Sequence, residues 1–177
     1  MFPKVVITGL GAVSPMGVGA GPLWDALKNG RSGVRPIASF DATTYDSRIA
    51  GEARDFKAAD HFDTKEARHI DRFAQFALVA TAEAMKDAGL ENGGLAKLDR
   101  DRCGVIVGSG IGGLQELETQ HRIFIEKGHS RVSPFFIPKL ITNMAAGLIA
   151  IKYKFRGPNY SISTACAHGA WYSATGT

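Results

Sequence analysis

The sequence predicts an α/β fold in which buried parallel strands alternate with helices. Short runs rich in β-branched residues stand at Lys4–Gly9, Cys103–Gly110 and Tyr160–Ala165, and stretches with helical periodicity separate them. Such alternation is typical of sheets whose neighbouring strands run parallel. Residues 1–177 contain no internal repeat and no linker, so we expect them to form one unit with a substantial core.

The first third of the chain predicts one strand, one helix and a long irregular region. Lys4–Gly9 is expected to be a buried strand that ends in a glycine-rich turn. Pro22–Gly30 predicts a short helix, because proline is favoured in the first turn of a helix and glycine follows the last. Residues 31–62 lack a sustained period and predict loops, with a short strand around Arg48–Ala50.

Three helices are predicted in the rest of the chain, and two of them are rich in small residues. Thr64–Gly89 is the clearest, and much of its apolar face is alanine, which lets a helix pack closely in a buried position. Gly113–Gly128 and Lys139–Lys154 predict the other two. Ser133–Pro138 is expected to be an extended loop between them.

Composition and charge narrow the classes of function. The formal net charge of +4 favours an acidic partner, but no segment combines dense Lys and Arg with aromatic residues, so nucleic-acid binding is not expected. Two cysteines make no disulfide framework, and no apolar stretch approaches the length of a membrane span. Glycines interrupt the apolar run near the N-terminus, which is therefore not expected to be a signal peptide. We expect a cytoplasmic protein that does not bind membranes.

Two glycine-rich segments follow predicted strands. In Gly9–Gly19, Ser14 stands where a dinucleotide-binding fingerprint has its third glycine, so we prefer a tightly packed turn to the nucleotide site of an oxidoreductase. Gly108–Leu114, with the sequence GSGIGGL, comes at the carboxyl end of a predicted strand, where α/β folds bind ligands. From the residues alone, this segment is either a turn or part of a site.

Cys166 is the candidate nucleophile. It follows a predicted strand and precedes small residues that could begin a helix, whose dipole would favour the thiolate. A sharp turn between strand and helix would also expose the thiol, as in serine hydrolases. A free cysteine is more often a small buried packing residue, so both interpretations stay open for Cys166, whereas packing is preferred for Cys103. The spacing of the five histidines predicts no metal site.

Basic residues recur along one side of the predicted helix at 64–89. They are Lys65, Arg68, His69 and Arg72, and Arg131 adds to them from a later loop. Their spacing places the first four in one stripe. The stripe is either a solvated helix face or a docking site for an acidic protein.

Four motifs together resemble a known family. In chain order they are VVITGLGAVSPMGVG, GSGIGGL, RVSPFFIPKLITNMAAG and RGPNYSISTAC. They resemble the β-ketoacyl-acyl carrier protein synthases of the elongating type II kind, over residues 2–166. The resemblance implies a thiolase-like layered fold with a mostly parallel sheet and buried small-residue helices. It also implies decarboxylative Claisen condensation in fatty acid elongation, with no cofactor and no metal.

The resemblance assigns roles to particular residues. Cys166 would accept an acyl chain from acyl carrier protein as a thioester, which the carbanion from malonyl-acyl carrier protein then attacks. Ile111, Phe135 and Phe136 would shape the acyl pocket. Three basic residues would bind the acidic carrier protein: Lys65, Arg68 and Arg131. The family implies a homodimer.

The sequence also departs from the family. Members are more than twice as long and contain two thiolase-like halves, so residues 1–177 are expected to be the N-terminal half. The catalytic histidines, their partner lysine and a glycine- and phenylalanine-rich gate belong to the other half. After Cys166, AHGAWYSATGT stands where small residues are expected. The chain is thus either part of a condensing enzyme or a naturally short, non-catalytic homologue that binds carrier protein.

Overall fold

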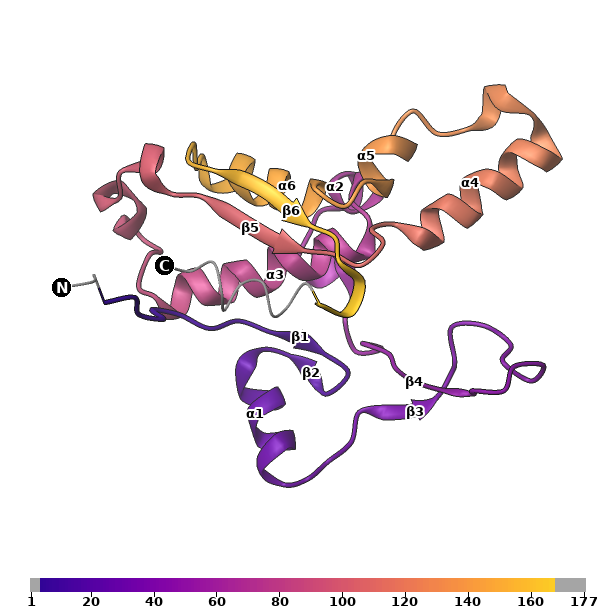
Figure 1. The fold of residues 1–177 in the computed structure, drawn as a ribbon, viewed down its shortest axis with the longest axis horizontal. Coiled ribbons are helices and arrows are strands. Elements are labelled where there is room, and N and C mark those ends of the chain that lie inside the picture. Colours follow the sequence, from indigo (N-terminus) through magenta and orange to yellow (C-terminus); the bar gives the residue numbers. More distant parts are fainter. Residues whose placement is uncertain (1–3, 168–177) are drawn as a thin grey trace.

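Two parallel strands and two helices form the centre of the molecule. The computed structural model describes residues 4–167 of the chain. Strands β5 (Val105–Gly108) and β6 (Asn159–Ile162) pair in parallel, and helices α3 (Arg72–Asp87) and α6 (Met144–Tyr153) pack beside them (Figure 1). The strands predicted at Cys103–Gly110 and Tyr160–Ala165 are therefore present, with ends that shift by a few residues. Of their residues in β5 and β6 only Val105 is buried, which corrects the expectation of buried strands.

The core is built from small residues where α3 meets α6. Ala74 of α3 is 1% exposed, and Ala145 and Ala146 of α6 are fully buried. Because alanine adds little bulk, the two helices can pack closely against each other. Larger side chains complete the core: Phe56, Phe62, Ile70, Leu78, Val105 and Ile149. The prediction of buried, small-residue helices is confirmed.

The long helix predicted at 64–89 is wrong in one respect, because the structure contains two helices there. Helix α2 (Thr64–His69) ends before Ile70, which is extended and turns into the core. Asp71 then caps α3, and its carboxylate accepts a hydrogen bond of 3.2 Å from the amide of Phe73. An aspartate that binds backbone amides in this way favours the start of a new helix over the continuation of an old one.

Helices α4 (Leu114–Lys127) and α5 (Phe136–Leu140) form an arm that projects from the centre (Figure 1). The predicted extended loop at Ser133–Pro138 is wrong in its second half, which begins α5. The helix predicted from Lys139 is also divided, since Ile141 is extended and α6 begins at Met144. The short helix η4 (His129–Arg131) lies at the outer end of the arm.

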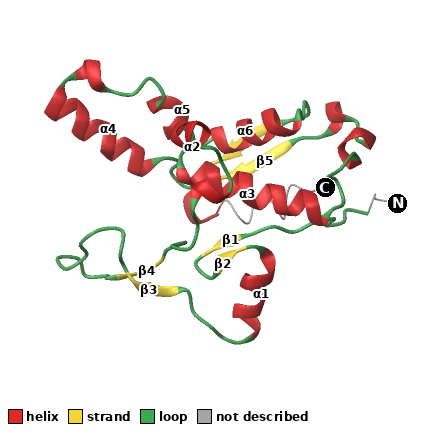
Figure 2. Cartoon of the chain, turned by 180° about the vertical axis from the view of Figure 1, so that it is seen from behind, coloured by secondary structure: helices red, strands yellow, loops and turns green. Residues whose placement is uncertain are grey.

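Two antiparallel pairs of strands lie below the centre in the view of Figure 1. Strand β1 (Val13–Ser14) pairs with β2 (Gly17–Val18), and β3 (Val34–Pro36) pairs with β4 (Ile49–Gly51). Helix α1 (Ala20–Lys28) follows β2 (Figure 2). Helix α1 and strand β4 match the prediction. Within the described residues, however, only β5–β6 is parallel, which corrects the mostly parallel sheet that we expected.

The prediction of a buried strand at Lys4–Gly9 is wrong. No strand is found there, and Val5, Val6 and Ile7 are 71%, 70% and 83% exposed. A buried strand in a parallel sheet needs neighbours that satisfy its backbone and cover its side chains. None of the strands in the described part of the chain pairs with this segment.

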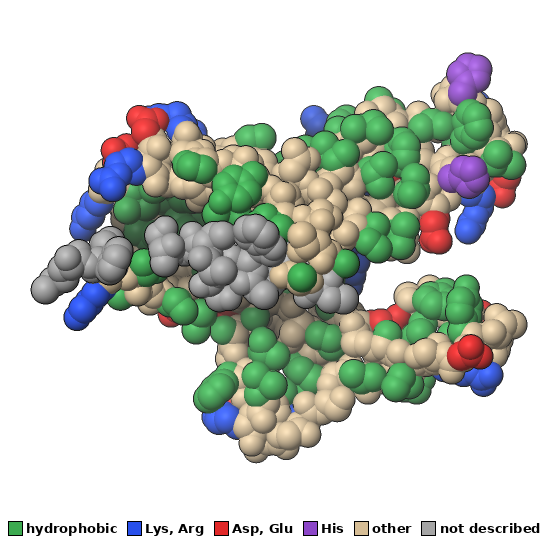
Figure 3. Space-filling model, in the orientation of Figure 1, with side chains coloured by type: hydrophobic (Ala, Val, Ile, Leu, Met, Phe, Trp, Pro, Cys, Tyr) green, Lys and Arg blue, Asp and Glu red, His purple; other side chains and the backbone are tan. Residues whose placement is uncertain are grey.

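The remaining elements are short, and much apolar surface stays open. Three further 3₁₀ helices stand at Ala58–Asp60, Gly94–Lys97 and Arg100–Arg102. Hydrophobic side chains gather over the arm, and a cleft separates the arm from the β3–β4 hairpin (Figure 3). Between residues 4 and 167, no helix is long and apolar enough to cross a membrane.

Candidate active site

The carboxyl ends of β5 and β6 bring two predicted motifs together. Gly108 is the register partner of Ile162, so the two strands end side by side. The amide of Ser109 donates to the Ile162 carbonyl at 3.2 Å, and the Ser163 hydroxyl donates to the Gly110 carbonyl at 3.1 Å. The GSGIGGL loop and the segment that leads to Cys166 therefore meet at the edge where α/β folds bind their ligands.

The backbone turns sharply just before Cys166. The cysteine belongs to the short helix η5 (Ala165–Ala167), which follows β6 after two residues. Ala165 has φ = +47°, a left-handed conformation that costs a non-glycine residue about 1–2 kcal/mol. In nucleophile elbows, a sharp turn after a strand is the place of the nucleophile. The Cys166 side chain and residues 168–177, with His168 among them, lie outside the described part of the structure.

The glycines of the GSGIGGL loop allow it to pack against α5. A Cβ on Gly112, whose φ is +79°, would lie 2.2 Å from the Leu140 carbonyl oxygen, and one on Gly113 would lie 2.2 Å from that of Lys139. The Gly112 amide donates to the Ser109 hydroxyl at 3.1 Å, and the Gly113 amide donates to the Leu140 carbonyl at 3.0 Å. Because both amides have internal acceptors, they do not form a phosphate cradle. Close packing explains these two glycines.

The three predicted pocket residues border this contact. Ile111 is 62% exposed at the tip of the loop, and Phe135 is 41% exposed just before α5. Phe136, the first residue of α5, is half-buried. The structure thus brings the loop that carries Ile111 next to the helix that carries Phe136, with the Ile111 side chain open to solvent.

The predicted carrier-binding residues fall into two groups. Lys65 and Arg68 are exposed on α2, near the base of the arm. Arg131 is exposed on η4 at the outer end of the arm (Figure 1). The structure brings the first two together but sets Arg131 apart from them.

The break between α2 and α3 also divides the predicted basic stripe. Arg72 begins α3, where its guanidinium donates to the Ala53 carbonyl at 2.6 Å and lies over two rings, those of Phe56 and Phe76. His69 stacks on Phe135, with ring centroids 3.9 Å apart. The helical spacing that placed Arg72 in one stripe with Lys65 and Arg68 is therefore wrong.

The N-terminal glycine-rich turn packs on α3. A Cβ on Gly9 would lie 2.1 Å from the Ala84 carbonyl oxygen. The amides of Leu10 and Ala12 donate to the carboxylates of Asp87 and Glu83, both at 2.9 Å. Backbone amides that already face carboxylates do not accept an anionic phosphate, so the turn is a packing element, as preferred from the sequence.

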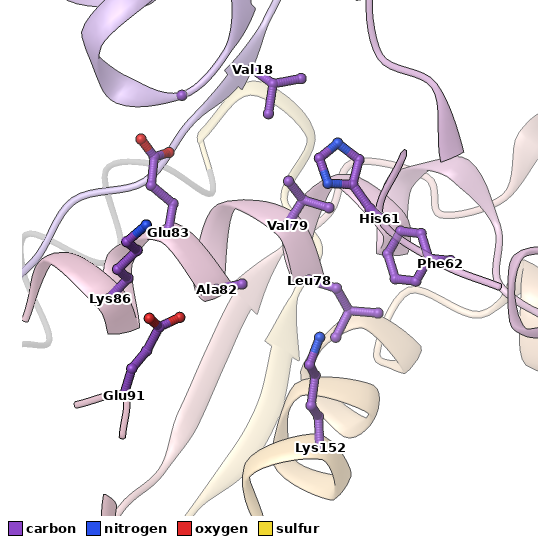
Figure 4. Close-up of a pocket in the computed structure, with 11 residues that line it drawn as sticks. Val18, His61, Phe62, Leu78, Val79, Ala82, Glu83, Lys86, Glu91 and Lys152 are labelled. Atoms are coloured by element: carbon purple, nitrogen blue, oxygen red, sulfur yellow. The ribbon is translucent and has the colours of Figure 1, made fainter. Parts of the chain in front are cut away.

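The cavity lined by residues of β2, α3 and α6 has a structural explanation. Its lining includes His61, Lys86, Lys152 and Glu83 (Figure 4). Besides the bond to Ala12, the Glu83 carboxylate accepts a hydrogen bond of 2.8 Å from the amide of Ala20, the first residue of α1. This carboxylate ties β1 and α1 to α3. Elsewhere, the Cys103 thiol is half-buried and donates to the Asp99 carbonyl at 3.2 Å, which fits a packing role.

Sequence reasoning missed a group of buried charges beneath the GSGIGGL loop. Glu116 of α4 is 8% exposed and forms an ion pair with Lys139 of α5. Asp71 lies beside them, and burial raises its pKa, although Lys139 opposes the shift. In the sequence, the residue that could have indicated this group is Gln120, which lies one helical turn after Glu116 on the same helix face. Across residues 4–167, no cluster of His, Cys, Asp or Glu is suited to hold a metal ion.

Solved structures identify the fold as that of ketosynthases. A β-ketoacyl synthase from Burkholderia phymatum superposes with a TM-score of 0.75 at 23% identity, over 98% of this chain and 42% of that one. A ketosynthase solved with its type II polyketide acyl-carrier protein superposes with a TM-score of 0.72 at 23% identity, over 94% and 43%. The thiolase-like architecture expected from the motifs is confirmed.

The sequence defines the family more narrowly. Residues 3–174 match the N-terminal domain of the β-ketoacyl synthases, and the chain belongs to that family. It is 47% identical over 167 residues to 3-oxoacyl-[acyl-carrier-protein] synthase 2 of Synechocystis, and 46% identical over 166 residues to the enzyme of that name from Coxiella burnetii. Each alignment covers 94% of this chain, which spans 39% of the length of either relative.

Proposed function

We propose that this chain carries the nucleophile of a 3-oxoacyl-[acyl-carrier-protein] synthase that elongates fatty acids. The observation that supports this most directly is the position of Cys166, in a sharp turn at the carboxyl edge of β6 and beside the GSGIGGL loop. The relatives named above support the class of reaction. The enzyme is thus an acyltransferase.

The first step transfers an acyl group to Cys166. Its thiolate attacks the carbonyl carbon of an acyl-acyl carrier protein thioester, a new C–S bond forms, and the carrier's thiolate leaves and takes up a proton. In the second step, malonyl-acyl carrier protein loses CO₂. The resulting carbanion attacks the Cys166 thioester, which releases the cysteine thiolate and 3-oxoacyl-acyl carrier protein.

The second step needs donors that polarise the malonyl thioester carbonyl. The family resemblance assigns this work to two histidines that match no position in residues 1–177. Acyl transfer to Cys166 is therefore the part of the cycle that this chain can perform, because it needs only a thiolate and backbone donors.

The remaining assignments follow from exposure and charge. Lys65 and Arg68 on α2, with Arg131 on η4, would receive the acidic carrier protein. Ile111, Phe135 and Phe136 would border the acyl chain. Exposed apolar residues on the arm, such as Ile125 at 68%, support a homodimer. The scarcity of cysteine supports a cytoplasmic location.

A second candidate is a naturally short, non-catalytic protein that binds carrier protein. The chain spans 39% of the length of its relatives, which fits a short protein and a piece of a longer one equally. The mass of the protein purified from its source separates the two. A mass near 18.9 kDa supports the short protein, and a mass more than twice as large supports the complete synthase.

The test of acyl transfer is the intact mass of the protein after incubation with an acyl-acyl carrier protein. We expect a gain equal to one acyl group, lost in Cys166→Ala and retained in Cys103→Ala. Cys103 is the matched control, since it is the other cysteine of the chain and lies at the opposite end of β5. Labelling that persists in Cys166→Ala, or wild-type protein that stays unlabelled, would contradict the proposal.

A further inference from the structure

A buried ion pair lies beside the GSGIGGL loop of the proposed acyl site. The proposed acyl transfer does not involve either of its residues. The side chain of Glu116 is 9% exposed and that of Lys139 is 19% exposed. They come from α4 and α5, the two helices of the arm. Charges that are this well buried cost folding free energy unless their geometry is well satisfied.

One set of contacts leads from the pair to the phenylalanines. The second carboxylate oxygen of Glu116 accepts a hydrogen bond from the Gln120 amide group at 2.9 Å. The oxygen of that amide group accepts one from the Ser133 backbone amide, also at 2.9 Å. Ser133 then binds the next residues, because its hydroxyl accepts from the Phe135 amide at 3.2 Å and its carbonyl from the Phe136 amide at 3.0 Å.

A second set of contacts leads from Lys139 to the loop that carries Ile111. The amide of Gly113 donates to the carbonyl of Leu140, the residue after Lys139, at 3.0 Å. Gly113 also packs tightly against α5 and Asp71. A Cβ at Gly113 would lie 2.2 Å from the Lys139 carbonyl oxygen and 3.2 Å from a carboxylate oxygen of Asp71. The position of the α5 backbone at Lys139 therefore fixes the position of the loop.

The electrostatics make this arrangement sensitive to each member. Two carboxylates, Asp71 and Glu116, face one ammonium group, Lys139, and all three interact. If Lys139 is removed, two acidic groups stay in a poorly hydrated place without a counter-ion. If Glu116 is replaced by glutamine, the negative charge is lost and one of the two acceptor oxygens becomes an NH2 group, so Gln120 and Lys139 can no longer both be held while the shape of the side chain is kept.

We propose that Glu116 and Lys139 are positioning residues that set the separation between the loop of Ile111 and the segment of Phe135 and Phe136, and thereby the acyl chain lengths that reach Cys166. The inference rests on the proposed function, because only an acyl acceptor at Cys166 gives this separation a meaning. Neither residue touches the reacting atoms. Their effect passes through Gln120 on one side and Gly113 on the other.

The test compares Glu116→Gln and Lys139→Met in the intact protein. The matched control is Asp25→Asn, which breaks an exposed ion pair with Lys28 on α1, where both side chains are more than half exposed. Two quantities are measured. One is hydrogen–deuterium exchange of the Gly113 and Ser133 amides, and the other is the rate of Cys166 acylation by carrier protein loaded with short, medium or long saturated chains.

We expect both arm variants to speed exchange at the two amides by about tenfold, as local opening becomes easier. We also expect the ratio of long-chain to short-chain acylation rates to change by about tenfold, a size typical of altered apolar pockets. Asp25→Asn should change neither quantity. A double variant, Glu116→Leu with Lys139→Met, should restore thermal stability with apolar packing but leave the ratio altered, because the bond to Gln120 stays absent.

Two outcomes overturn the inference alone. In one, all chain lengths slow by the same factor and the ratio is unchanged, which would mean a general loss of folded protein. In the other, exchange at Gly113 and Ser133 stays at the wild-type rate. Wild-type protein that accepts no acyl chain of any length would instead overturn the proposed function, and the inference with it.

Discussion

Gly11 shows how a single residue fixes the N-terminal segment against α3. A Cβ at Gly11 would lie 1.9 Å from the Ala80 carbonyl oxygen and 2.8 Å from the Ala84 amide nitrogen. Both atoms belong to helix backbone, which cannot yield as a flexible side chain would. Any side chain at Gly11 must therefore push the segment away from the helix and break the 2.9 Å bond between the Ala12 amide and Glu83.

We predict that Gly11→Ala destabilises the protein by about 1–3 kcal/mol, the usual cost of overpacking. The measurement is the free energy of unfolding in urea. The matched control is Gly21→Ala in α1, where a Cβ meets nothing within 4 Å. Alanine is favoured over glycine inside a helix by about 1 kcal/mol, so that variant should be neutral or more stable. Equal losses in the two variants would contradict the contact.

Single residues also show what the sequence can reveal. Cys166 follows a strand and precedes small residues, and this local pattern correctly predicts a sharp turn. The pair of Glu116 and Lys139 joins residues 23 positions apart, so no local pattern contains it. Lys139 also lies next to Pro138 in an apolar stretch, where a lysine is ordinarily expected to reach solvent.

Among the elements, the β3–β4 hairpin depends on one carboxylate. Glu52, just after β4, accepts hydrogen bonds of 3.0 Å from the amides of Ala38 and Ser39, which follow β3. It also pairs with Arg54. Hydrogen bonds from Ser39, then from the Ala38 backbone and from Arg54, lower the pKa of Glu52 from 4.5 to about 2.

This shift predicts a pH-dependent contribution of Glu52 to stability. Because the folded pKa is depressed, the contribution is fully present above pH 4.5 and is lost as the pH falls from 4.5 towards 2. Glu52→Gln should therefore be less stable than wild type at pH 7, and the difference should shrink through this window. Denaturant unfolding at several pH values measures it, with Asp25→Asn as the control. A difference that is independent of pH would contradict the prediction.

The helix at 64–89 shows where element prediction fails. Its apolar period is continuous, yet Asp71 divides it, because a capping carboxylate binds the Phe73 amide more favourably than another helical turn would. Asp63 has the same role for α2, where it accepts a 2.7 Å bond from Glu66. An aspartate is equally compatible with a cap and with the polar face of a continuous helix, so the apolar period alone does not reveal the division.

At the scale of the whole molecule, the sequence predicts the class of fold but not the partners of each strand. Lys4–Gly9 has the composition of a buried strand, and its residues are nevertheless exposed. Burial is a property of neighbours, and no strand among residues 10–167 pairs with this segment. The same reasoning explains why Ile111, in a loop with the sequence of a site, is open to solvent.

The exposed N-terminal run gives a prediction for the 177-residue chain as a whole. Val5, Val6 and Ile7 are consecutive, lie in no helix or strand and are at least 70% exposed, so they offer apolar side chains together with backbone groups that pair with no strand of the described residues. Such a segment is a template for association with another strand. We expect the chain to self-associate as its concentration rises, and Val6→Lys to weaken that association by about tenfold, equivalent to ~1.4 kcal/mol. Sedimentation velocity over a range of concentrations measures the association. Ile151→Lys on α6 is the matched control, since Ile151 is 72% exposed but belongs to a helix, whose backbone is internally bonded. If the two substitutions weaken association equally, apolar exposure alone drives it. If only Val6→Lys does so, strand pairing at residues 5–7 is the cause.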